Sequence, residues 1–345
     1  MENQRKIRTT GSEPVANDHG PSTMRAVMYR RYGGPDVLEF LETAKPEPGP
    51  GKVLVRVGAA GLDRGTWHLM AGEPRAVRLA VGMRAPRNPV PGIDFAGEVV
   101  AVGAGVVGFA AGDRVLGVAA GSFAECVLAD ARKVVQLPEG ITWEQAAALP
   151  TSGATALQAL QKAGALGTGT RMLVTGASGG VGSFVVQLAK LHGAHVSAEC
   201  SAHKTDFVAS LGADVVYDRA GGGAFSGDAA YDVVIDIAGN PSIATLRRIL
   251  ATDGRAVIVG AEVPGPSLTG MNRQMRAVLV SPFLRQSLSM LVSVNKKQDL
   301  TGLVELMSAG KLESRIDKTF RLGEAREAME YLVAGSVCGK VVLVP

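Results

Sequence analysis

The chain has 345 residues, enough for two ordinary domains, and 46 % of them are hydrophobic, enough to fill two cores. Its formal net charge is only +4 and no basic run alternates with aromatic residues, so no nucleic-acid partner is expected. Charged residues interrupt every long apolar run, so neither a membrane-spanning helix nor a membrane partner is expected.

The N-terminal residues and the cysteines indicate in which cellular compartment the protein is expected. Residues 1–23 are polar, carry balancing charges and lack the apolar region of a signal peptide, so we expect a disordered extension. The three cysteines, Cys126, Cys200 and Cys338, lie far apart and show no spacing typical of a disulfide framework. We therefore expect a reducing, cytoplasmic location.

From Met24 the chain is dominated by short apolar runs of strand length, separated by Gly and Pro. This spacing predicts an all-β, barrel-like first domain. The expected strands are 25–29, 52–60, 93–102, 114–118, 124–128 and 133–137. Residues 143–162 then follow a helical pattern with Thr142 as a plausible N-cap. Because Pro150 should break or kink it, we expect two shorter helices there.

The stretch 171–191, RMLVTGASGGVGSFVVQLAKL, combines a strand pattern, a glycine-rich turn and a helix pattern. Glycines in this context let the backbone approach a pyrophosphate, which the N–H groups and dipole of the helix then attract. Ala177 stands where the fingerprint G-x-G-x-x-G has its first glycine, so a plain βα turn remains an alternative.

The same turn also contains G-x-S-x-G around Ser178, the nucleophile motif of α/β-hydrolases. In that fold an acid and then a histidine follow the serine along the chain. The histidines after Ser178 are His192, His195 and His203, all close behind the turn, so the hydrolase interpretation lacks its base.

Strand and helix patterns alternate after the turn, which favours a parallel sheet covered on both faces and hence a doubly wound α/β fold. The expected strands are 195–200, 231–238, 255–261 and a last one at 276–281, with helices near 204–211 and 241–250. A helix at 299–309, strands at 320–322 and 339–344, and a helix near 324–334 complete the chain, and this tail is expected to return to the first domain.

Six motifs occur in an order that resembles the zinc-independent medium-chain dehydrogenase/reductase superfamily, on its quinone oxidoreductase branch. They are PGIDFAG at 91–97, GDRV at 112–115, GSFAE at 121–125, LPTSG at 149–153, GASGGVG at 176–182 and GKVV at 339–342. The resemblance covers nearly everything after Met24. It implies a GroES-like β-barrel substrate domain (24–148 and 287–345), a Rossmann NADP-binding domain (149–286) and a nicotinamide cofactor between them.

Zinc alcohol dehydrogenases of the same superfamily need Cys and His ligands. The corresponding stretches here read GLD at 61–63 and PGID at 91–94, without either residue type. Three cysteines cannot furnish a four-cysteine zinc site either, so we expect no metal.

The end of the second nucleotide-domain strand indicates which cofactor binds, because NAD-binding proteins place a carboxylate there to hold the ribose 2′-OH. Cys200 occupies that position, and Ser201, Lys204 and Arg219 lie where this branch holds a 2′-phosphate, so NADP(H) is expected. Glu199 argues against it, although strand alternation should point its side chain away from the ribose. Alternatively, Lys204 and Arg219 are solvated surface charges.

The resemblance implies that the loop carrying Asp63, Thr66 and Trp67 faces the nicotinamide. Asp63 stands where quinone reductases of this branch usually carry Asn, so it either relays a proton or caps a turn. Further expected cofactor contacts are Thr151, Ser178, Gly179, Gly180, Val181, Gly182, Gly260, Ala261 and Lys340. Asn295 is expected either to make an amide contact or to cap a loop.

The expected function is NADPH-dependent hydride transfer to a quinone, an enone or a similar small-molecule carbonyl. An alcohol dehydrogenase or enoyl reductase on the same scaffold, or an NADPH-binding sensor without turnover, remain alternatives. The arginine-rich segment 73–87 either attracts an anionic substrate or forms a solvated lid. An edge strand at 276–281 predicts a homodimer, unless Pro282 and the neighbouring arginines protect that edge.

Overall fold

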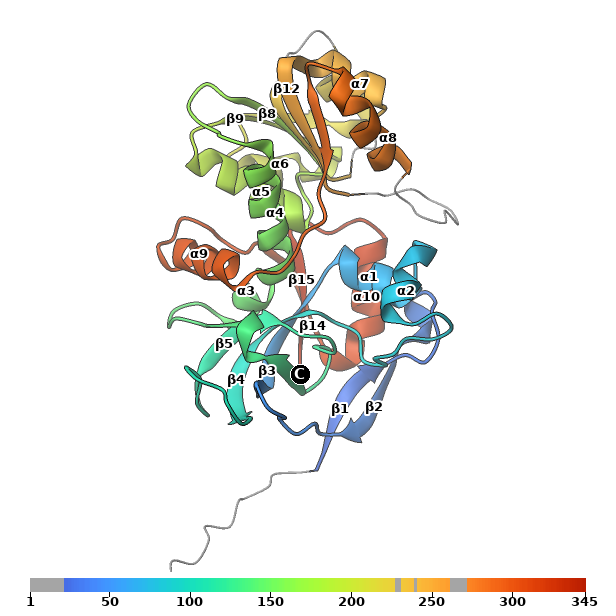
Figure 1. Ribbon diagram of the computed structural model, residues 1–345, viewed down its shortest axis with the longest axis vertical. Coiled ribbons are helices and arrows are strands. Elements are labelled where there is room, and N and C mark those ends of the chain that lie inside the picture. The colour runs from blue at the N-terminus through green and yellow to red at the C-terminus, as the bar shows by residue number, and fades with distance from the viewer. Residues whose placement is uncertain (1–21, 227–230, 239–240, 261–271) are drawn as a thin grey trace, which may run out of the picture.

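The computed structural model describes residues 22–226, 231–238, 241–260 and 272–345. These residues form a seven-stranded sheet and a six-stranded sheet, which occupy the lower and upper halves of Figure 1, and a separate two-stranded ribbon. The expected combination of a doubly wound α/β sheet and a separate β-rich domain is present.

The lower sheet is mainly antiparallel, and its long strand β3 (Lys52–Leu62) pairs with strands from both ends of the chain. Its order is β14-β15-β3-β4-β5-β7, and β6 also pairs with β3. The other strands are β4 (Asp94–Val102), β5 (Arg114–Val118), β6 (Cys126–Asp130), β7 (Val134–Gln136), β14 (Ile316–Arg321) and β15 (Lys340–Val344). Since β15 pairs with β3, the C-terminal residues lie in the same sheet as the first strands.

The ribbon and the small helices surround this sheet. The ribbon consists of β1 (Thr23–Met28) and β2 (Glu39–Ala44), and it joins the sheet region through a bridge between Ala26 and Ala124. The α-helices here are α1 (Arg64–Ala71), α2 (Arg78–Val81) and α10 (Ala325–Val333). Short 3₁₀ turns, here and in the upper half, are Pro35–Val37, Arg75–Val77, Ala131–Lys133, Ala202–Lys204, Arg219–Gly221, Gly223–Phe225, Ser281–Phe283 and Leu322–Glu324.

Two helices connect the sheets, and their boundary is where the sequence predicts it. Helix α3 (Trp143–Ala147) begins with a capping box in which Thr142 and Gln145 satisfy each other's backbone N–H groups. Helix α4 (Pro150–Ala163) starts with Pro150 in its first turn, where the missing N–H costs nothing. The expected break at Pro150 is confirmed.

The upper sheet is entirely parallel, with the order β10-β9-β8-β11-β12-β13. Its first strand along the chain, β8 (Arg171–Thr175), is central, so the sheet is doubly wound about it. The other strands are β9 (His195–Cys200), β10 (Val215–Asp218), β11 (Tyr231–Asp236), β12 (Leu250–Ile258) and β13 (Ser287–Met290). The helices are α5 (Gly180–Leu191), α6 (Thr205–Ser210), α7 (Ile243–Ile249), α8 (Asn272–Val280) and α9 (Lys297–Ser308).

Residues 276–281 do not form the predicted edge strand, because they lie mostly in helix α8. Gln274 and Ala277 are the buried side chains, three residues apart as on one helix face, while Val278, Leu279 and Val280 are exposed. The edge of the sheet is β13 instead, which pairs with β12. The domain boundary expected at 286/287 is therefore wrong, because β13 belongs to the upper sheet.

Residues 1–21 of the expected N-terminal extension lie outside the described residues, and Thr23 already begins β1. Three strands, β2, β10 and β13, were not expected from the sequence. All three are short, and their residues include many polar or charged side chains.

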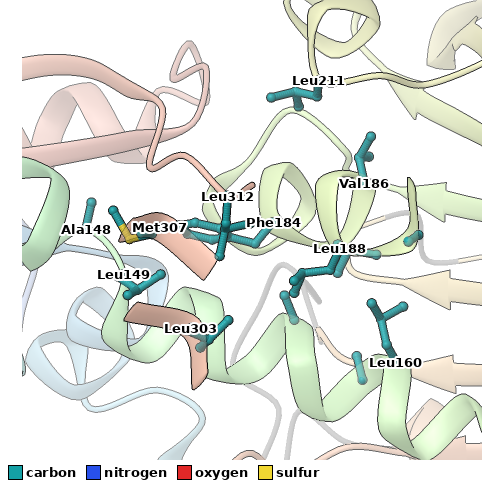
Figure 2. Packing of buried hydrophobic residues seen from close by; sticks show 14 of the residues in the cluster. Ala148, Leu149, Leu160, Phe184, Val186, Leu188, Leu211, Leu303, Met307 and Leu312 are labelled. Carbon is teal, nitrogen blue, oxygen red and sulfur yellow. The ribbon is translucent and has the colours of Figure 1, made fainter. Parts of the chain in front are cut away.

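One hydrophobic cluster continues from one sheet to the other, in addition to a separate cluster in each half. Leu149, the N-cap of α4, packs within it together with Leu160 of α4, Phe184 and Leu188 of α5, and Leu303 of α9 (Figure 2). The same cluster includes Ala59, Ala96 and Leu116 of the lower sheet and Met172, Val174 and Val196 of the upper one. Since α3, α4 and α9 lie between the two sheets in Figure 1, this core fixes the relative position of the two halves.

Candidate active site

The glycine-rich turn between β8 and α5 is shaped by close backbone contacts. Gly176 has φ +66°, and a Cβ atom on Gly182 would lie 2.3 Å from the carbonyl oxygen of Gly176. A Cβ atom on Gly179, in contrast, would have one neighbour within 4 Å, the same oxygen at 3.6 Å. Gly182 is therefore needed for the packing of the turn, whereas Gly179 presents open backbone to a ligand.

The first turn of α5 lies beside a buried lysine. A Cβ atom on Gly180 would lie 2.8 Å from Cδ of Lys340 and 3.0 Å from Oγ of Ser152. Lys340 is 2 % exposed, and its ammonium group donates a 3.0 Å hydrogen bond to that hydroxyl. A helix N-terminus with a lysine beside it attracts an anion, so these residues fit the pyrophosphate of a dinucleotide.

The backbone ties this turn to the C-terminal strand. The N–H of Gly339 donates to the carbonyl oxygen of Ser178 at 2.8 Å, and the N–H of Lys340 donates to that of Arg315. The expected cofactor contacts Ser178, Gly179, Gly180, Val181, Gly182 and Lys340 thus lie together. Val181, in the first turn of α5, is half-buried.

Asp63 and Thr66 lie at the start of α1 with buried polar atoms that have no partner among the described residues. Oδ1 of Asp63 accepts a 2.8 Å hydrogen bond from the N–H of Thr66, so Asp63 is the N-cap of α1. Oδ2 of Asp63 and Oγ1 of Thr66 are buried without hydrogen bonds. Because such groups cost about 1–3 kcal/mol each when unsatisfied, a polar ligand group is their natural partner.

Trp67 is half-buried, and its ring meets that of His68 edge-on, with the ring centroids 4.8 Å apart. Nδ1 of His68 lies 3.0 Å from the carbonyl oxygen of Glu73, and since a carbonyl oxygen only accepts, His68 donates this hydrogen bond in the tautomer that carries its proton on Nδ1. Trp67 also packs against the hydrophobic cluster of the lower half, so it presents a partly exposed apolar ring beside α1.

Asp94, to which sequence reasoning gave no role, is completely buried where β4 begins. Its carboxyl group accepts two hydrogen bonds from Thr151, one from N–H at 3.0 Å and one from the hydroxyl at 2.5 Å. Burial, and then the charge of Asp63, raise the pKa of Asp94 to about 7, against the opposing effects of Lys340 and Thr151. The signal in the sequence was a carboxylate between apolar residues, Ile93 and Phe95.

The residues expected at the 2′-phosphate separate into two groups. Arg219 donates from Nε to Oε1 of the buried Glu199 at 3.1 Å, and its side chain is 46 % exposed. Lys204 is only 5 % exposed, and its ammonium group donates to the carbonyl oxygens of Gly335 and Val337 at 2.6 and 2.9 Å. Lys204 therefore joins the two halves of the molecule, whereas Arg219 stays open to solvent.

Cys200 is completely buried at the end of β9, and Ser201 follows it directly, half-buried. Burial raises the pKa of the Cys200 thiol, while the positive charges of Lys204 and Arg219 act against this rise. Both cations therefore lie near the position at which a carboxylate would hold the ribose in an NAD site.

Four expected contacts remain, Gly260, Ala261, Asn295 and Thr151. Gly260 follows β12 and accepts a hydrogen bond from Nε2 of Gln274 at 3.2 Å, whereas Ala261 lies outside the described residues. Asn295 lines a small cavity together with Pro150 and Ala154 of α4. Thr151, in the first turn of α4, is held by Asp94.

In the ranges that the structure describes, no three His, Cys, Asp or Glu side chains are grouped so that they could hold a metal ion. Nor does any helix in those ranges have the length and apolar character needed to cross a membrane.

Comparisons with known proteins match both halves of the chain to dehydrogenase domains. Residues 49–139 match the family model of the alcohol dehydrogenase GroES-like domain, and residues 211–343 match that of a zinc-binding dehydrogenase. The chain is similar to the chloroplast envelope quinone oxidoreductase homolog of Arabidopsis thaliana, with 34 % identity over 93 % of this chain and 98 % of the relative.

Two solved structures extend the likeness to the fold. The quinone oxidoreductase from Coxiella burnetii aligns with a TM-score of 0.82 and 30 % identity, over 94 % of this chain and 99 % of the other. The mycobacterial protein Rv1454c, solved in complex with NADPH, aligns with a TM-score of 0.77 and 26 % identity, over 93 % of this chain and 100 % of the other.

Proposed function

The chain belongs to the quinone oxidoreductase-like branch of the medium-chain dehydrogenase/reductase superfamily, and is an oxidoreductase with a small-molecule substrate. From this premise we propose that it transfers hydride from NADPH to a quinone, an enone or a similar conjugated carbonyl, without a metal ion. One observation carries the proposal. The anion-attracting turn at Gly180 and Lys340 and the unpartnered polar atoms of Asp63 and Thr66 occupy the same end of the lower sheet.

The phosphate end of the site supports a dinucleotide. The N–H groups at the start of α5 point along the helix axis toward the open backbone of Gly179, and Lys340 adds a fixed positive charge. Ser152, which receives the hydrogen bond of Lys340, holds this ammonium group at Gly180. When bound, NADPH supplies the hydride, and these residues bind and orient it.

Arg219 and Ser201 support NADPH rather than NADH. Since Glu199 binds Nε of Arg219, the two terminal nitrogens of the guanidinium group remain available for a 2′-phosphate. The hydroxyl of Ser201, next to Cys200, adds a second donor. Lys204 contributes its positive charge nearby, while its hydrogen bonds go to Gly335 and Val337.

The substrate end uses Asp63, Thr66 and Trp67. The Thr66 hydroxyl can donate to a carbonyl oxygen, and Oδ2 of Asp63 can take and give a proton beside it. Trp67 offers an apolar surface to the ring or alkene of the substrate. No zinc is required in this scheme, because Thr66 polarises the carbonyl and Asp63 handles the proton.

The proposal extends to assembly and compartment. The edge of β13 and the exposed Met275, Val278, Leu279 and Phe283, which are 50, 43, 67 and 87 % exposed, support a homodimer through the upper sheet. The free thiols of Cys126, Cys200 and Cys338 support a reducing compartment such as the cytoplasm.

The test is NADPH oxidation against a panel of quinones, enones, simple ketones and alkyl alcohols (the last with NADP⁺), before and after exhaustive chelation. We expect turnover with quinones or enones that chelation leaves unchanged. Turnover only with alcohols and simple ketones would establish an alcohol dehydrogenase. NADPH binding without turnover on any member would establish a sensor.

A further inference from the structure

We propose that Asp94 holds the proton that the reduced substrate takes up, and that it passes this proton to the substrate by way of Asp63. The inference rests on the proposed function, since it names the proton source of the same site. Asp94 is assigned no contact with the substrate, so its role is to hold and position the proton for Asp63.

Strand register brings the participating residues to one end of the lower sheet. Asp94 pairs with Gly61 across β3 and β4, and Val341 pairs with Leu62 across β15 and β3. The next position along each chain is Asp63 on one side and Lys340 on the other. Asp63, Asp94 and Lys340 are 8, 0 and 2 % exposed, and the charges of Asp63 and Lys340 both act on the carboxyl group of Asp94, so the three form one buried cluster.

The charges of this cluster favour retention of one proton. Two ionised carboxylates against one ammonium group would leave a net negative charge among buried side chains, which is expensive. The carboxyl group of Asp63 caps α1, where its Oδ1 accepts an N–H bond at the positive end of the helix dipole. Asp94 is the better acid, because it is fully buried and feels the charge of Asp63.

Thr151 can serve both protonation states of Asp94. Its N–H and hydroxyl both donate to the carboxylate, and the hydroxyl can rotate to accept a hydrogen bond when Asp94 is protonated. The charged and titratable groups facing Asp94 are Asp63 from the end of β3 and Lys340 from β15, with Thr151 of α4 as the hydrogen-bonding neighbour. Lys340 compensates the negative charge that remains after the proton leaves.

The step balances as follows for a quinone. A bound NADPH would supply the hydride to the quinone, one hydrogen with two electrons from a C–H bond of its nicotinamide. One proton moves from Asp94 to Asp63 and another from Oδ2 of Asp63 to the substrate oxygen, which yields a hydroquinone and the oxidised cofactor. Asp94 is left ionised beside Lys340, and it takes one proton from solvent before the next turnover.

The first test needs no cofactor and no substrate. Infrared spectra of the full-length protein between about pH 5 and about pH 9 report the C=O stretch of buried protonated carboxyl groups. We expect such a band to titrate near pH 7 and to be missing in Asp94→Asn. It should persist in the control Asp253→Asn, a surface carboxylate 74 % exposed. A spectrum without this band at pH 7, or a band that persists in Asp94→Asn, would overturn the proposal.

The second test measures how kcat for quinone reduction by this protein depends on pH. Because the acid form of Asp94 is the active one, kcat should be high below its pKa of about 7 and fall above it. Asp94→Asn should lower kcat by about 10²-fold or more at neutral pH, leave the Kd of NADPH within about twofold, and remove this alkaline limb. An unchanged limb in Asp94→Asn contradicts the proposal.

A second variant guards against misfolding of Asp94→Asn. Thr151→Val removes the hydroxyl that stabilises the Asp94 anion, so it should move the alkaline limb of kcat to higher pH while keeping Asp94 in place. A limb that stays where it was refutes the role of Asp94. If the protein reduces no acceptor at all, the proposed function is wrong. If it is an active reductase but lacks the infrared band, only the proposed role of Asp94 in holding the proton is wrong.

Discussion

At the scale of single residues, two glycines of the same turn have different tasks. Gly182→Ala places a Cβ atom 2.3 Å from the oxygen of Gly176, so the turn must shift. We expect a loss of about 1–3 kcal/mol in the free energy of unfolding, as for other overpacked sites. Thermal or urea unfolding without cofactor measures it.

Gly179→Ala is the matched control for that substitution. Its Cβ atom would have Gly176 O at 3.6 Å, an ordinary contact, so stability should change by less than about 0.5 kcal/mol. NADPH affinity should nevertheless fall, because the new methyl group stands where a phosphate approaches. Equal stabilities for the two variants would show that the turn is not packed as described.

Arg219 carries the cofactor preference. Arg219→Ala should weaken NADPH by about 1–3 kcal/mol and leave NADH nearly unchanged, because only the 2′-phosphate loses a charge-assisted bond. Calorimetry with both cofactors measures the difference, and Arg285→Ala, which alters a surface arginine paired with Asp253, is the control. A parallel loss for both cofactors would mean that Arg219 serves only Glu199.

Residue types predicted the site better than they predicted individual contacts. The glycine pattern at 176–182 located the turn between β8 and α5, and Ala177 at the first fingerprint position did not disturb it. Lys204 was expected at the phosphate, yet its ammonium group lies against Gly335 and Val337, about 130 residues away in sequence. Such a partner depends on how the two halves pack, which no local pattern reveals.

At the scale of elements, the same lysine connects α6 to the segment before β15. Lys204→Met leaves two carbonyl oxygens without their donor, so we expect stability to fall by about 1–3 kcal/mol. NADPH and NADH should weaken by similar factors. A selective loss of NADPH affinity, with stability unchanged, would instead make Lys204 a direct phosphate ligand.

The type of an element could be predicted from the sequence where apolar, buried residues follow the pattern of a strand or a helix. The prediction failed where they do not. Strands β3, β4, β8, β9 and β11 have mostly buried residues and match the expected positions. The run Val278, Leu279 and Val280 has strand-forming residues, but Pro282 and the helix-forming residues before it favour α8, which buries Ala277. The true edge strand, SLSM, carries no comparable apolar signal.

At the scale of the whole molecule, the exposed face of α8 indicates how two copies would associate. Val278→Asp puts a charge into the proposed interface, so light scattering at micromolar concentration should show a dimer become a monomer. Val107→Asp, at a position 89 % exposed in the lower half, should leave the dimer intact. A wild-type monomer at every accessible concentration would mean that the β13 edge is covered within one chain.

The central claim is that the junction of the two sheets binds NADPH and reduces a conjugated carbonyl. The most direct measurement is the steady-state rate of NADPH oxidation with a quinone and with an enone, compared with the rate for NADH at equal concentration. We expect turnover with both acceptors that prefers NADPH and falls by about 10²-fold in Asp94→Asn, since Asp94 holds the proton that the substrate takes up. Turnover that prefers NADH, or no turnover with either acceptor, would contradict the central claim.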